Sequence, residues 1–97
     1  MAKGYLVVCY RKINNQEKWA AYAKLAAPAI QKAGGRFIVR GMPMKIYEQG
    51  VRERTVIVEF DNVHKAVAAH DSVDYQIALK ALGDGAERDM RVVEGVG

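Results

Sequence analysis

Cysteine is nearly absent from the sequence, which contains Cys9 alone among its 97 residues. A single thiol cannot form an internal disulfide, and one thiolate is too few for a structural zinc site. Stability must therefore come from side-chain packing. Because Cys9 lies in the middle of an apolar stretch, we expect it to be a small buried hydrophobic residue rather than a nucleophile.

Long hydrophobic runs are absent too. The longest stretches without a charged residue, 4–10 and 25–31, contain seven residues each, whereas a helix needs about 20 apolar residues to cross a bilayer. Lys3 is followed by no apolar core of signal-peptide length and by no small-residue cleavage site. We therefore expect a cytoplasmic protein with no membrane partner.

A concentration of charge of one sign is also missing. The chain has 15 Lys and Arg against 11 Asp and Glu, a formal net charge of +4. Basic and acidic residues nevertheless alternate, as they do over 52–54 and 87–91. Without a basic stripe, the sequence predicts a mixed charged surface and no nucleic-acid partner.

No signature of cofactor or metal binding is present. The segment 83–85 (Gly-Asp-Gly) lacks both the spacing and the lysine of a phosphate-binding loop. His64 and His70 are six residues apart, which corresponds to about 240° around a helix, so they cannot form the two-histidine face of a metal site. The sequence predicts neither a cofactor nor a metal.

What the sequence does contain is the pattern of one globular domain, 1–97, with 51% hydrophobic and 27% charged residues. Apolar runs and turn signals predict strands over 4–10, 36–40, 54–60 and 90–94, and helices over about 15–33, 63–70 and 72–82. We expect the second strand to continue over 44–48 after a bulge. This order is that of an α+β, ferredoxin-like split β-α-β fold, a four-stranded antiparallel sheet with its helices on one face.

The strands are apolar on both faces although helices cover only one. Tyr5 and Val7 oppose Leu6 and Val8 in the first strand, and Ile57 opposes its neighbours in the third. A monomer would expose an apolar patch larger than the few hundred Å² that single chains usually tolerate. The pattern therefore predicts a homodimer in which two sheets pack face to face, a dimeric α/β barrel.

Several short segments together resemble a known family. They are Tyr22, Pro28 and Ala29, 34–37, Arg40 and Gly41, 58–60, 71–72, 75–76 and 93–95. In order and spacing they resemble the bacterial proteins grouped as domain of unknown function 1330, within the dimeric α/β barrel superfamily. The resemblance covers nearly the whole chain and implies that fold. It leaves the function open, because members of the superfamily range from heme-degrading and quinol monooxygenases to pure ligand-binding proteins.

Four polar residues are candidates for a ligand site between the helices and the sheet. Arg40 and Glu59 lie on neighbouring predicted strands, where they form either a structural ion pair or an anion-binding site. Tyr22 and Tyr75 each lie on the helix stripe that faces the sheet, where their hydroxyl groups reach the same space or the rings serve only as core aromatics.

His70 is the fifth candidate. It precedes Asp71 at the junction of two predicted helices, and a neighbouring carboxylate suits an imidazole to acid–base work near neutral pH. The alternative is a surface histidine at a helix end. His70 and Tyr75 are therefore the candidate catalytic residues, without an assignment of a reaction.

Together these residues predict a cleft that binds a small aromatic or carboxylate-bearing molecule. Whether the protein also transforms this ligand is left open by the sequence. If it is an enzyme, the resemblance implies a cofactor-free oxygenase or isomerase. The alternative is a non-catalytic dimeric binding or assembly module, in which the same residues only hold the dimer together.

Overall fold

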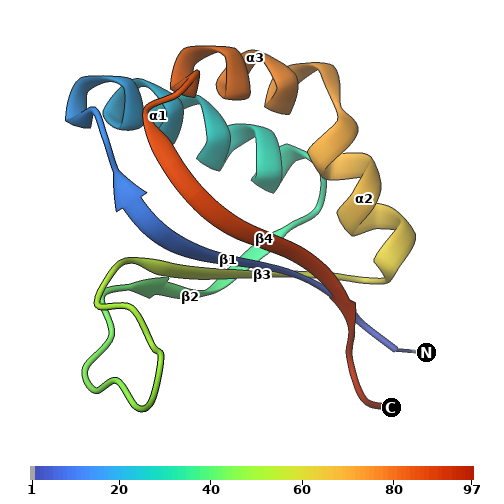
Figure 1. Ribbon diagram of the computed structural model, residues 1–97. Helices are drawn as coiled ribbons and strands as arrows, with labels where there is room; N and C mark the ends of the chain where they lie inside the picture. The colour runs from blue at the N-terminus through green and yellow to red at the C-terminus, as the bar shows by residue number, and fades with distance from the viewer. Residues whose placement is uncertain (1) are drawn as a thin grey trace.

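The computed structural model describes residues 2–97. It contains four strands and three helices in an order that follows the ferredoxin-like pattern (Figure 1). In chain order they are β1 (Gly4–Ile13), α1 (Gln16–Lys32), β2 (Arg36–Gly41), β3 (Thr55–Phe60), α2 (Val63–Asp71), α3 (Val73–Leu82) and β4 (Ala86–Glu94). No helix within 2–97 has the length and hydropathy needed to span a membrane.

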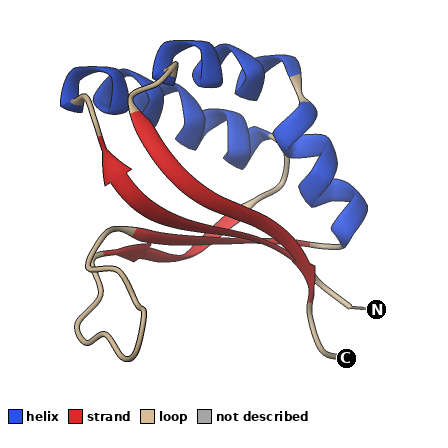
Figure 2. Ribbon diagram, in the orientation of Figure 1, coloured by secondary structure: helices blue, strands red, loops and turns tan. Residues whose placement is uncertain are grey.

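The four strands form one antiparallel sheet in the order β2-β3-β1-β4. All three helices pack on the same face of this sheet, which confirms the predicted fold (Figure 2). Alternate residues of β1 therefore have different surroundings. Leu6, Val8 and Tyr10 are buried beneath the helices, only 3–5% exposed, because successive side chains of a strand point to opposite faces.

None of the helices found in residues 2–97 covers the other face of the sheet, which we call the bare face. Cross-strand pairing places on it Tyr5, Val7, Cys9, Arg36, Val39, Thr55, Ile57, Glu59, Asp89, Arg91 and Val93. Val39 and Val93 are 42% and 48% exposed there. Cys9 is exposed as well, so the expectation that it is buried is wrong for the single chain, because it alternates away from the helix-covered face.

Side-chain caps define the helix boundaries. The Asn15 side chain accepts a hydrogen bond from the Lys18 amide, 3.0 Å, at the start of α1. The helix then continues without a break through Pro28, which lies on its exposed side. Ser72 separates α2 from α3: its hydroxyl donates to the carbonyl of Ala69 (2.8 Å) and accepts from the amide of Tyr75 (3.2 Å). This confirms the predicted restart of the helix at Ser72.

Residues 42–54 form a loop instead of the strand predicted over 44–48. Pro43 has no N–H group to donate to a sheet. The apolar side chains that suggested a strand do not pack against the core: Met44 is 96% exposed and Tyr47 is 75% exposed. The predicted bulge lies earlier in the chain, between Phe37 and Val39. β4 also begins at Ala86 rather than at residue 90, because β1 extends to Ile13 and supplies backbone partners for 86–89.

Candidate functional site

A cavity of about 130 Å³ lies between the helices and the helix-covered face of the sheet. Most of its wall is apolar and comes from β1, β2, β3 and α1, and its lining includes Leu6, Val8, Ala23, Ala26, Ala27, Ile30, Phe37, Val56 and Val58. An apolar cavity of roughly 150 Å³ in another protein holds benzene. The space therefore suits one six-membered ring, with substituents that extend toward its opening.

Two arginines, Arg40 of β2 and Arg54 just before β3, line this cavity. The sheet register pairs Arg40 with Val56, and Arg54 precedes Val56 by two residues, so both side chains start from the helix-covered face. Arg40 is exposed, which places it at the opening, and Arg54 is half-buried. Both guanidinium groups therefore stand on one side of the cavity.

Each of these guanidinium groups lies over an aromatic ring instead of a carboxylate. The Arg40 Cζ is 4.6 Å from the centroid of the Phe37 ring, and the Arg54 Cζ is 5.4 Å from that of Trp19. Within residues 2–97, no carboxylate oxygen lies within 4.0 Å of either group. Both positive charges of the cavity lining therefore remain available to an anion.

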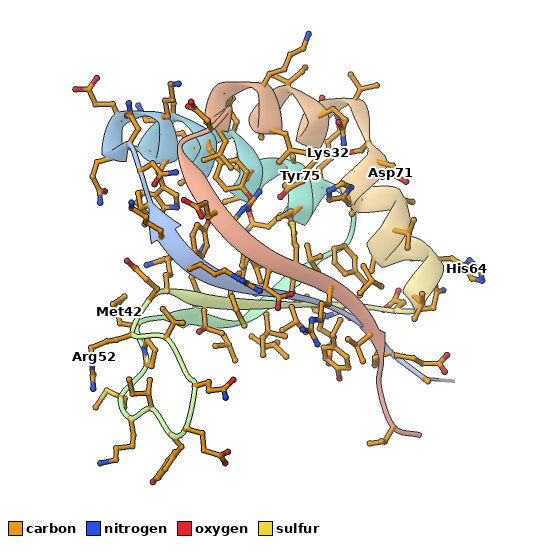
Figure 3. All side chains as sticks on the ribbon, viewed as in Figure 1. Lys32, Met42, Arg52, His64, Asp71 and Tyr75 are labelled. Atoms are coloured by element: carbon orange, nitrogen blue, oxygen red, sulfur yellow. The ribbon has the colours of Figure 1, made fainter. Side chains whose placement is uncertain are left out.

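A hydrogen-bonded cluster of two tyrosines and an arginine forms another part of the site. The hydroxyl oxygens of Tyr22 (α1) and Tyr75 (α3) are 2.6 Å apart, and Arg88 Nη1 of β4 donates to the Tyr22 hydroxyl at 2.9 Å. Burial, followed by the proximity of Tyr75, raises the pKa of the Tyr22 phenol. Tyr22 therefore keeps its proton near neutral pH and is a hydrogen-bond donor rather than a base. Figure 3 shows Tyr75 between the helix layer and the sheet.

A second polar pair lies where α1 begins. Trp19 Nε1 donates a hydrogen bond to the Tyr10 hydroxyl, 3.1 Å, and both residues line the cavity. Burial raises the pKa of Tyr10 as well, so this phenol is also neutral. Among the described residues that line the cavity none is acidic. The site thus offers donors and positive charge and is complementary to an anion or an acceptor.

The structure brings three of the five predicted site residues, Arg40, Tyr22 and Tyr75, to this cavity. Glu59 is not among them, and the predicted Arg40–Glu59 ion pair is wrong. Glu59 points to the bare face, where it accepts hydrogen bonds from the Tyr5 hydroxyl (3.0 Å) and Arg36 Nε (3.2 Å).

The bulge in β2 is the reason for this separation. Arg36 pairs with Glu59 on the bare face, but Arg40 pairs with Val56 on the helix-covered face. In a regular strand two residues four positions apart share a face. The extra residue at Ile38 shifts the alternation by one, so it moves Arg40 from the bare face to the cavity.

His70 lies outside the cavity lining. Its Nδ1 is 2.9 Å from the Asp71 carboxylate, so the predicted neighbours do meet. The imidazole also packs against Tyr75, with 5.2 Å between the ring centroids. His70 therefore contacts a cavity residue from outside, where it supports the Tyr75 ring and does not face the space that a ligand would fill.

Comparison with protein families identifies the chain. The family model described as "Domain of unknown function (DUF1330)" matches residues 3–96. The chain belongs to the DUF1330 family. A search of curated protein sequences gave no match for this DUF1330 chain.

Solved structures show the same fold at low sequence identity. A protein of unknown function from Rhodopseudomonas palustris is 18% identical with a TM-score of 0.71, over 96% of this chain and 80% of that one. A protein from Nitrosomonas europaea, named as a candidate antibiotic biosynthesis monooxygenase, is 14% identical with a TM-score of 0.62, over 98% and 97% of the two chains. A dimeric ferredoxin-like protein of unknown function from Thermobifida fusca is 15% identical with a TM-score of 0.55, over 99% and 92%. At these identities the similarity establishes the fold alone.

Sequence reasoning missed Arg54, Arg88, Trp19 and Tyr10 as polar residues of the DUF1330 site. Arg54 could have been found from its spacing of two from Val56, an apolar residue of the helix-covered face. Arg88 gave no such signal, because the last strand was expected to start two residues after it. Within 2–97, no group of three or more His, Cys, Asp or Glu is placed to hold a metal ion.

Proposed function

We propose that this DUF1330 protein binds a small aromatic molecule that carries an anionic group, such as a carboxylate, in the cavity between its helices and its sheet. The observation that carries the proposal is the pair of arginines, Arg40 and Arg54, which line an apolar cavity and have no carboxylate partner within residues 2–97. The cavity volume of about 130 Å³ limits the buried part of the ligand to roughly one ring.

Electrostatics support an anion over a neutral ligand. Arg40 lies on β2 and Arg54 directly before the neighbouring strand β3, and both line the cavity from the helix-covered face, so their positive charges repel each other. A carboxylate between them removes this repulsion and accepts hydrogen bonds from both guanidinium groups. The aromatic rings beneath the two groups hold them in place before the ligand arrives, which lowers the entropy cost of binding.

The test compares benzoate with benzamide, which has nearly the same shape without the negative charge. Calorimetric titration should show that benzoate binds more tightly. We expect Arg54→Met, at a half-buried position, to weaken benzoate binding roughly tenfold, because a hydrogen bond to a charged group contributes about 1.5–3 kcal/mol. The exposed Arg40→Met should have a smaller effect, since water screens its charge.

Arg52→Met is the matched control. Arg52 lies in the 42–54 loop and extends away from the cavity (Figure 3), so its replacement lowers the net charge equally but should leave the benzoate affinity unchanged. Equal affinity for benzoate and benzamide, or an equal loss in all three variants, would overturn the proposal in favour of a general charge effect.

A second proposal concerns assembly: the bare face packs against the bare face of another copy and forms a homodimer. It is supported by the exposed apolar side chains Val39 and Val93 on that face and by the dimeric state stated for the ferredoxin-like neighbour from Thermobifida fusca. If benzoate and related anions do not bind, a dimeric assembly module without a ligand becomes the function that this surface favours.

A further inference from the structure

The Tyr22–Tyr75–Arg88 cluster has three donor groups but forms only two hydrogen bonds among the described residues. Its two hydroxyl groups carry two protons but share one hydrogen bond, and Arg88 supplies a further donor to the Tyr22 oxygen. Among the described residues, one hydroxyl proton of the pair therefore has no acceptor. An unpaired buried donor is costly, so the position of this proton indicates what the cavity is built to receive.

Burial decides which of the two protons is left over. The Tyr75 residue is 0% exposed, and the Tyr22 oxygen is the one side-chain acceptor that it meets within residues 2–97. Tyr75 therefore donates to Tyr22. The Tyr22 oxygen then accepts two hydrogen bonds, one from Tyr75 and one from Arg88, and both of its lone pairs are used.

The proton that remains belongs to Tyr22, which is 7% exposed and lines the cavity from α1. A hydroxyl that accepts a hydrogen bond from a cation is polarised and becomes a stronger donor. The packing of the Tyr75 ring against Tyr22, edge to face with 6.0 Å between centroids, fixes the orientation of the pair. The cavity wall thus carries a strong, oriented donor that has no acceptor in the described part of the protein.

We infer that Tyr22 donates a hydrogen bond to a second acceptor atom of the ligand, and that the cavity therefore selects aromatic anions which carry a carbonyl or similar oxygen in addition to the charged group. Arg88 and Tyr75 act through Tyr22 and are positioning residues. This inference rests on the proposed function, because it assumes that the cavity holds a ligand whose anionic group meets Arg40 and Arg54.

The experiment uses two probes of nearly equal shape, 4-acetylbenzoate and 4-isopropenylbenzoate, which differ by one carbonyl oxygen in place of a methylene group. Both retain the carboxylate for the arginines. We expect the ketone to bind more tightly than the alkene in the wild type. In Tyr22→Phe the affinity ratio of ketone to alkene should fall about fivefold, because one neutral hydrogen bond is lost. Tyr75→Phe keeps the Tyr22 hydroxyl and should lower the ratio less. Tyr47→Phe, in the exposed loop, is the control and should leave it unchanged.

Infrared spectroscopy gives a second measurement, which reports on the carbonyl group directly. The ketone stretch of bound 4-acetylbenzoate should lie at lower frequency than in an apolar solvent, because a hydrogen-bond donor weakens the carbonyl bond. In Tyr22→Phe this downshift should disappear while the probe still binds.

The possible failures are distinguishable. If both probes bind but Tyr22→Phe leaves their ratio and the carbonyl frequency unchanged, the inference is overturned and the proposed function stands. The same holds if Tyr10→Phe, which removes a different hydroxyl of the cavity wall, causes the whole loss instead. If neither probe binds the wild type, the proposed function fails and the inference with it.

Discussion

Arg36 and Arg40 show how the surroundings of a single residue decide its role. Arg36 contacts the carboxylates of Glu59 and Asp61, at 3.2 and 3.3 Å, so its charge is neutralised by the protein itself. Arg40, four residues later, lies over the ring of Phe37 and forms no ion pair within residues 2–97. Two residues of one type in one strand thus differ in role: Arg36 is structural, the role proposed for Arg40 is ligand binding, and their position relative to the bulge separates the two.

At the same scale, the ion pairs of Arg36 predict how stability depends on pH. Hydrogen bonds from Tyr5 and then Arg36 lower the pKa of Glu59. A carboxylate whose pKa is lower in the folded state contributes stability above its unfolded value, about 4.3, and loses it as the pH falls through the folded value. We expect the unfolding free energy to decrease below about pH 4.5, and Glu59→Gln to remove part of that decrease.

Urea denaturation at a series of pH values between about 3 and 7 measures this effect. Glu94→Gln is the control, because Glu94 lies at the exposed end of β4 and forms no ion pair within residues 2–97. An acid dependence that is the same in Glu59→Gln and in the wild type would contradict the prediction.

At the scale of elements, α1 forms one wall of the cavity, and we expect a single substitution to change its distance from the sheet. Pro28 cannot donate a hydrogen bond to the carbonyl of Lys24, so we predict that it bends the helix away from the sheet. The small side chains of Ala23, Ala26 and Ala27 line the cavity from this helix, and a straight helix would let them approach the sheet closely.

Pro28→Ala should therefore leave the fold intact, raise the free energy of unfolding by about 1–3 kcal/mol, and weaken benzoate binding as the cavity narrows. Denaturation and calorimetry on the same preparation measure the two effects. Gln31→Ala, on the exposed side of the same helix, is the control for a general change in helix propensity. A stabilised variant with unchanged benzoate affinity would show that Pro28 does not keep the cavity open.

The elements also show what the sequence could predict. Apolar runs, turn signals and caps were sufficient for β1, α1, β3 and the division at Ser72, because these signals are local. The bulge at Ile38 carries no local signal: no glycine or proline marks it, and its position follows from how β2 pairs with β3. The face of Arg40 therefore had to come from the structure, and with it the correct partner of Glu59.

The early start of β4 depended on pairing in the same way. Residues 86–89 are mostly charged and have little intrinsic strand preference, but the extension of β1 to Ile13 gives them a partner. Arg88 then faces the helices opposite Tyr10. The place of Arg88 in the site thus depends on how β1 pairs with β4, strands far apart in the chain. Composition and periodicity do not encode this pairing.

At the scale of the whole molecule, the bare face predicts that the protein sediments as a dimer. Ile57 lies near the centre of that face, between Val7 and Val39. We expect the wild type to sediment at twice the 10.8 kDa chain mass at micromolar concentration, and Ile57→Lys to sediment as a monomer, because a buried charge without a partner opposes assembly.

Val73→Lys is the matched control, since Val73 is 75% exposed at the start of α3 on the opposite side of the molecule. Circular dichroism should show that both variants keep the secondary structure of the wild type. A wild type that sediments as a folded monomer would contradict the homodimer.

β3 places one residue of the proposed interface directly between two residues of the cavity: Ile57 faces outward, and Val56 and Val58 line the ligand space. A movement of β3 at the proposed interface therefore also moves the cavity wall, and a movement at the cavity also moves the interface. If the ligand affinity of each site differs between dimer and monomer by some factor, the dimerisation constant must change by that same factor for each ligand bound. The two cavities of a dimer would then be in thermodynamic communication through a single layer of backbone, and a binding curve steeper or shallower than that of independent sites would be its signature.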